Sequence, residues 1–115
     1  MHKKNHARES ETREAMRGGA GKITVRHYFK PGDLKARTRL CAELVIPAGA
    51  SIGAHDHVDE DEIYIIHRGK GIMTDGGEEF EVAAGDAVVT GQGAFHSIRN
   101  TGTEDLLITA VIIKY

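Results

Sequence analysis

The chain has 115 residues, a formal net charge of -2 from 15 basic and 17 acidic side chains, and one cysteine. This length is close to the commonest domain size, so we expect one domain with one core. The balanced charge, with no basic run interleaved with aromatic residues, argues against a nucleic-acid partner.

The sequence gives no sign of a membrane segment. No apolar stretch is long enough to cross a bilayer, and the charged start at Met1–Lys4 is not followed by the apolar run of a signal peptide. The single cysteine, Cys41, excludes an internal disulfide and suits a reducing compartment. We therefore expect a cytoplasmic protein that does not bind membranes.

Residues 1–22 are predicted to form an N-terminal arm outside the main domain. The segment is polar, and Ser10–Arg17 has the composition for one or two helical turns that end at Gly18. One interpretation is a flexible arm, because so polar a segment buries too little apolar surface to offset the conformational entropy lost on ordering. The other is an arm packed on a partner subunit or across the mouth of the main domain, where Arg17 would meet an acidic substrate.

Residues 23–115 are predicted to form a series of short strands separated by turns. The 14 glycines and alternating apolar positions favour this all-β class over a helical one. Asp75-Gly76 reads as a hairpin turn, and the apolar run 106–113 suits a strand buried on both sides. About nine such strands predict a two-sheet jelly roll whose closure removes most free edges.

Histidines lie at metal-ligand spacing in the middle of this region. His55 and His57 are two residues apart, so an extended backbone points both imidazoles the same way. Glu62 follows on the next strand, and His96 comes from a later one. The sequence therefore predicts a metal site with three imidazoles and one carboxylate.

These residues fall in two longer patterns that resemble the motifs of the cupin family. The first pattern is complete, and the second departs only at Gly91, where proline is usual. The fixed positions are Gly49, His55, His57, Glu62 and Gly69 in the first motif, and Gly85, Gly93, His96 and Asn100 in the second. The resemblance implies a double-stranded β-helix, the jelly-roll barrel of cupins, over residues 23–115. It does not fix the reaction, since one fold hosts many chemistries.

The strand that carries Glu62 has two faces. If Glu62 points inward to the metal, Tyr64 and Ile66 point inward too, while Ile63 and Ile65 point outward. Because exposed apolar faces mark contact surfaces, we expect a homodimer through the outer sheet face. The candidate substrate-binding residues are Tyr64, Ile66, Ile98 and Arg17.

The ligand set favours certain metals. Four protein ligands on an octahedral ion leave two neighbouring positions open, which suits Mn²⁺ or Fe²⁺. Catalytic zinc usually keeps three protein ligands, so Zn²⁺ and Ni²⁺ are the alternatives.

Two functions remain open at this stage. The first is a metalloenzyme that decarboxylates or oxidises a small carboxylate or oxo-acid, as the resemblance to oxalate decarboxylase-type cupins implies. Tyr64 is its only candidate catalytic residue, while Glu60 and Asp61 read as loop charges or as partners of the histidines. The second is a metal-dependent module that binds or senses a small carboxylate or sugar without turnover.

Overall fold

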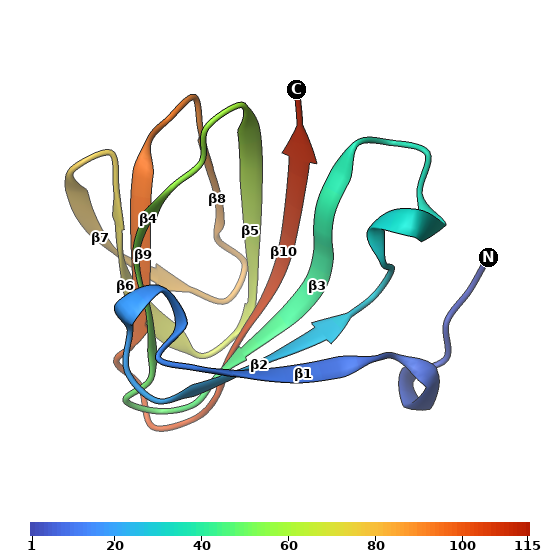
Figure 1. Ribbon diagram of the computed structural model, residues 1–115. Helices are drawn as coiled ribbons and strands as arrows, with labels where there is room; N and C mark the ends of the chain where they lie inside the picture. The colour runs from blue at the N-terminus through green and yellow to red at the C-terminus, as the bar shows by residue number, and fades with distance from the viewer.

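The computed structural model describes residues 1–115 as ten antiparallel strands and three short 3-10 turns (Figure 1). No helix of the chain has the length and apolar character that a bilayer crossing requires. The strands are β1 (Ser10–Glu14), β2 (Lys22–His27), β3 (Thr38–Ile46), β4 (Ser51–Asp56), β5 (Glu60–Arg68), β6 (Lys70–Asp75), β7 (Glu78–Ala83), β8 (Ala87–Gly91), β9 (Phe95–Asn100) and β10 (Leu106–Lys114). The 3-10 turns are η1 (Asn5–Ala7), η2 (Met16–Gly18) and η3 (Pro31–Asp33).

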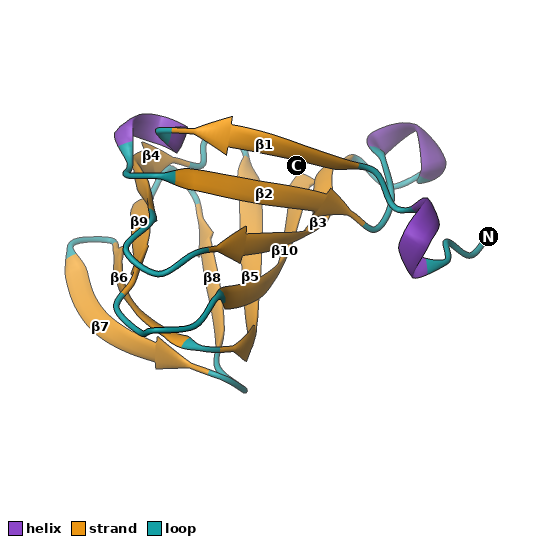
Figure 2. Ribbon diagram, turned by 90° about the horizontal axis from the view of Figure 1, so that it is seen from below, coloured by secondary structure: helices purple, strands orange, loops and turns teal.

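The strands form two sheets that face each other (Figures 1 and 2). The larger sheet has six strands in the order β1-β2-β3-β10-β5-β8, and the smaller has four in the order β4-β9-β6-β7. A cluster of 15 buried side chains fills the space between them. The all-β jelly-roll prediction is therefore confirmed, and it places β4 and β9 opposite β5, so that side chains of both sheets can meet inside.

The inward and outward faces of β5 follow the predicted alternation. Tyr64 and Ile66 are buried, whereas Ile65 keeps 40% of its surface exposed and Ile63 is half-buried. The alternation holds because β5 pairs with β10 on one side and β8 on the other, which fixes both faces of the strand.

The expectation that the run 106–113 is buried on both sides is wrong for a single chain. Leu106, Ile108 and Ala110 are buried, but the alternate residues of β10 are only half-buried and Ile113 is 41% exposed. The reason is that β10 lies in the middle of the larger sheet, whose outer face has no second layer above it. The outward side chains of β10 are therefore only half-buried or exposed.

The N-terminal residues differ from the predicted helical turns. Ser10–Glu14 is strand β1, paired with β2 from Ser10 opposite Arg26 to Glu14 opposite Lys22. Without β1, β2 would be an edge strand with unpaired backbone groups, and pairing satisfies them. Tertiary hydrogen bonding thus overrides a weak local helix preference, and only Met16–Gly18 forms a 3-10 turn.

Residues 15–19, which we call the strap, are the first part of the connection between β1 and β2. They lie against β4. Ala15 and Arg17 both have left-handed backbones, with φ of 48° and 54°. Non-glycine residues adopt this conformation at a cost and keep it where surrounding structure imposes it. Here a side chain on Gly53 of β4 would overlap the carbonyl oxygen of Arg17, and one on Gly19 would overlap that of Ser51. The strap is therefore fixed by backbone-to-backbone packing.

Candidate metal centre

Three histidines and one glutamate converge between the two sheets. Their ligating atoms all lie within 4.8 Å of one another. His96 Nε2 is 2.9 Å from His57 Nε2 and 3.0 Å from His55 Nε2, and Glu62 Oε1 is 3.0 Å from the Nε2 atoms of His57 and His96. The side chains of His57, Glu62 and His96 are buried, and that of His55 is half-buried.

The backbone explains this convergence. His55 lies directly opposite His96 in the β4–β9 pair, so both rings leave the smaller sheet on its inner face. Glu62 approaches from β5 of the larger sheet. The structure thus brings together all four predicted ligands.

The spacing of these atoms fits a single divalent ion. Imidazole and carboxylate ligands bind such ions at roughly 2.1 Å, and two ligands at right angles then lie about 3.0 Å apart. Four of the six separations, at 2.9 to 3.0 Å, match that value. The group could therefore hold a metal ion.

Each histidine uses its other ring nitrogen to contact a different group, which fixes the ring orientation. In every case the Nδ1 atom makes this contact, so Nε2 faces the common centre. The partners are the Gly53 carbonyl oxygen at 2.7 Å for His55, Glu60 Oε1 at 2.8 Å for His57, and Thr90 Oγ1 at 3.0 Å for His96.

Both glutamates near the centre stay ionised. Burial alone would raise the pKa of Glu62, but hydrogen bonds with His57 and His96 outweigh it and hold the pKa at about 2. Hydrogen bonding with Arg39 is the main reason that the pKa of Glu60 is also about 2. An ionised Glu62 is the form that binds a cation.

The histidines differ in their affinity for protons. Burial lowers the pKa of His55 below its ordinary value. Burial acts in the same direction on His57, but hydrogen bonds with Glu62 and Glu60 outweigh it, and its pKa is raised. Because a ligating imidazole must be free of a proton on Nε2, protons compete with a metal more strongly at His57 than at His55.

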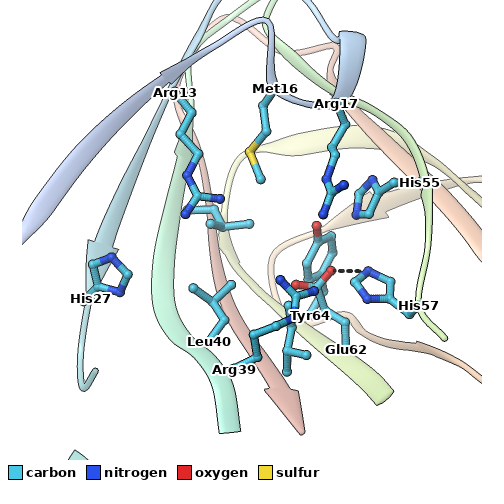
Figure 3. A pocket seen from close by; sticks show the side chains of 12 residues that line it. Arg13, Met16, Arg17, His27, Arg39, Leu40, His55, His57, Glu62 and Tyr64 are labelled. Carbon is cyan, nitrogen blue, oxygen red and sulfur yellow. Dashed lines mark ion pairs between the residues drawn. The ribbon is translucent and has the colours of Figure 1, made fainter. Parts of the chain in front are cut away.

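A cavity of about 100 Å³ opens beside three of the four candidate ligands, His55, His57 and Glu62 (Figure 3). One part of its wall is apolar, and three arginines supply much of the rest. Arg13 pairs with Glu11 at 2.7 Å, whereas Arg17 has no carboxylate within 4.0 Å and extends from the strap toward His55. The lining residues are Arg13, Met16, Arg17, His27, Arg39, Leu40, Leu44, His55, His57, Glu62, Tyr64 and Ile112.

Of the four candidate substrate-binding residues, two lie at this cavity. Arg17 and Tyr64 line its wall, and burial raises the pKa of the Tyr64 phenol well above its ordinary value. Ile66 and Ile98 belong to the hydrophobic core instead. Ile66 is two residues beyond Tyr64, and two residues of extended strand move a side chain about 6.6 Å, which takes it away from the cavity.

A family model described as "Cupin domain" matches residues 42–112. The chain belongs to the cupin family. This cupin is 42% identical over 98 residues to a Thermotoga maritima protein named oxalate-binding protein, covering 85% of this chain and 81% of the relative. It is also 34% identical over 84 residues to an uncharacterized protein of Methanocaldococcus jannaschii, covering 73% of this chain and 67% of the relative.

A solved structure extends the likeness to the whole chain. The cupin matches the crystal structure of a predicted oxalate decarboxylase from Thermotoga maritima with a TM-score of 0.95 and 37% identity. The match covers 100% of both chains, so it includes the N-terminal strand and the strap.

The departure of this cupin from the second motif has a structural reason. Gly91 lies opposite Asp61 in the β5–β8 pair, and a Cβ at position 91 would overlap the Asp61 carboxylate. Asp61 in turn accepts a hydrogen bond from the Tyr115 hydroxyl at 2.5 Å. Asn100 of the same motif has a structural role, because its amide donates to the carbonyl oxygens of Ile46 and Glu104 at 2.8 and 2.7 Å.

Sequence reasoning missed several residues of the site. Arg13, His27 and Arg39 line the cavity, yet each comes from β1, β2 or β3, far from the motifs in the chain. Of the two acids left open, Glu60 contacts a histidine and Asp61 does not. The position of Glu60 three residues after His57 was the one available signal.

Proposed function

We propose that this cupin binds a small organic acid, with oxalate as the first candidate, at a divalent metal held by His55, His57, Glu62 and His96. One observation carries the proposal: three of the four convergent residues line a cavity where the Arg17 guanidinium has no carboxylate partner. The name of the Thermotoga maritima relative supports oxalate as the ligand. The cavity is far smaller than the roughly 300–1,000 Å³ of ordinary ligand pockets, which favours a ligand of few atoms.

The metal in this proposal is Mn²⁺ or Fe²⁺. A set of three imidazoles and one carboxylate suits an octahedral ion of this kind. Four protein ligands then leave two adjacent positions for the oxygens of an acid. Zn²⁺ and Ni²⁺ are the alternatives.

In this proposal, different groups of the cavity bind different parts of the anion. A bound metal would supply a Lewis acid for one end of the ligand. Arg17 would donate charge-assisted hydrogen bonds to its other carboxylate oxygens. Tyr64, whose high pKa keeps the phenol neutral, would donate a hydrogen bond to the anion.

Decarboxylation or oxidation of the bound acid is the catalytic form of this proposal, and binding or sensing without turnover is the alternative. Apart from the metal ligands and the arginines, Tyr64 and His27 are the titratable side chains in the cavity wall. Neither is a carboxylic acid placed to exchange a proton with the ligand. This composition supports binding, and turnover would depend on the metal itself.

The experiment is a titration of Mn²⁺-loaded protein with oxalate by calorimetry, followed by assays for formate, carbon dioxide and peroxide. We expect binding, and we expect Arg17→Met to weaken it by about 10- to 100-fold, since hydrogen bonds to charged groups contribute roughly 1.5–3 kcal/mol. Arg99→Met is the matched control, because Arg99 is exposed on β9 and does not line the cavity. No oxalate binding to loaded protein would refute the proposal, and any product would select the catalytic form.

We also propose that residues 1–22 form a segment distinct from the barrel of residues 23–115. The segment adds β1 to the edge of the larger sheet and supplies the strap that carries Arg17. Its contribution to the cavity wall supports packing across the mouth of the barrel over a flexible arm.

The proposed assembly is a homodimer through the outer face of the larger sheet. Ile65, Val89 and Ile113 are 40%, 62% and 41% exposed on β5, β8 and β10, and Ile63 is half-buried beside them. Ile65→Asp is expected to convert a dimer to a monomer, which light scattering coupled to gel filtration measures directly. A wild-type protein that is monomeric at high concentration would contradict the assembly.

A further inference from the structure

The metal centre has a feature that its ligand set does not explain: one histidine contacts a buried carboxylate that is paired with a partly exposed arginine. Glu60, only 7% exposed, accepts from His57 Nδ1 at 2.8 Å. Arg39 then donates to both oxygens of the same carboxylate, from Nε at 2.9 Å and from Nη2 at 2.6 Å. The three side chains form a continuous chain from β3 to the common centre.

This arrangement makes His57 different from the other two histidines. His55 and His96 contact a neutral carbonyl and a neutral hydroxyl, whereas His57 contacts a carboxylate. A carboxylate only accepts, so when Nε2 of a neutral His57 ligates a metal, the ring proton would lie on Nδ1 and face Glu60. The same contact makes the imidazole a stronger base toward a metal.

Arg39 keeps Glu60 in this position. A buried carboxylate without a cation is strongly unfavourable. A bidentate guanidinium contact keeps the carboxylate ionised and holds it in one orientation. Glu60 is the first residue of β5 and Arg39 the second residue of β3, so the pair joins two strands of the larger sheet. Without Arg39, Glu60 would be free to turn toward solvent.

We propose that Glu60 and Arg39 are positioning residues for His57 and that the metal affinity of this cupin depends on them, although neither belongs to the four ligands. The inference rests on the proposed function, because it takes the four convergent residues to be metal ligands. It goes beyond that function in naming the pair of residues that sets how well one ligand binds.

The test is titration of the metal-free protein with Co²⁺, followed by the visible absorption of the bound ion. Glu60→Ala is expected to lower Co²⁺ affinity by about 10- to 100-fold and to change the spectrum, which reports ligand geometry. Glu60→Gln should restore part of the affinity, because its amide oxygen still accepts from Nδ1. Arg39→Met should lower the Co²⁺ affinity as well. Arg39→Lys should lower it by a smaller factor, since lysine keeps the positive charge but cannot make the bidentate contact.

The control is the ion pair between Arg26 and Glu43, 3.2 Å apart, which joins β2 to β3 without touching a histidine ligand. Glu43→Gln and Arg26→Met should leave Co²⁺ affinity and spectrum unchanged, whatever they do to thermal stability. The inference is overturned if Glu60→Gln and Arg39→Met bind Co²⁺ like these controls. If Glu60→Ala does not fold, the Co²⁺ affinity of Glu60→Gln, whose side chain has nearly the same shape as that of glutamate, decides the test.

The two proposals fail in different ways. A wild-type protein that binds no divalent metal refutes the proposed function and this inference together. A wild-type protein that binds Co²⁺, with His55→Ala unable to bind and Glu60→Ala unimpaired, refutes only the positioning role.

Discussion

The His55→Ala variant is expected to bind a divalent metal at least about 100-fold more weakly than the wild type while keeping the barrel folded. Loss of residues that only orient a ligand already costs about 10- to 100-fold, so loss of a ligand should cost more. Folding should survive because the core cluster does not include His55. Equilibrium dialysis followed by elemental analysis measures the metal, and thermal melting of the metal-free protein measures the fold.

Two further variants sharpen this result. Glu62→Gln keeps the shape of the side chain but removes the one negative charge among the ligands, and it should also lose the metal. His67→Ala removes a histidine from the outer face of β5, where it contacts Thr109 at 2.6 Å, and should bind as well as the wild type. Unchanged metal binding by His55→Ala would refute the ligand assignment. An unfolded His55→Ala would instead indicate a structural metal.

The ligand set could be predicted because it depends on local geometry. His55 and His57 are two residues apart on extended backbone. Once Glu62 was taken to point inward, strand alternation required Tyr64 to point inward and Ile65 to point outward. Strand alternation is a property of the backbone, so a sequence pattern suffices to read it. The same reasoning gave the jelly-roll class.

The rest of the site could not be predicted because it depends on contacts between distant segments. Arg39 meets Glu60 across 21 positions of chain, and Arg13 reaches the cavity only because β1 pairs with β2. The pairing of β1 comes from an open strand edge, which no local propensity records. Strand alternation correctly predicted that Ile66 points inward. It could not show how far along β5 the cavity extends, and Ile66 lies beyond it.

The Gly53→Ala variant is expected to lose most of its affinity for the organic acid while keeping its metal. A Cβ at this position would overlap the carbonyl oxygen of Arg17, and the obstacle is backbone on both sides, so no side-chain rotation relieves it. His55 of β4 is paired with His96 of β9, although the pairing is irregular between Ile52 and His55, whereas the strap holds two residues in the left-handed region. The strap should therefore move, with a loss of about 1–3 kcal/mol in the free energy of unfolding.

The measured quantities are oxalate affinity and metal content of the same preparation. If the strap places Arg17 over the metal centre, Gly53→Ala should weaken oxalate binding as much as Arg17→Met does, and the double variant should be no worse than either one. Gly32→Ala is the control, because its added methyl group enters open space and its backbone lies outside the left-handed region. Oxalate affinity unchanged in Gly53→Ala would mean that the strained strap does not serve ligand binding. A loss matching that of Arg17→Met would show that a backbone contact 36 residues along the chain positions the anion-binding residue.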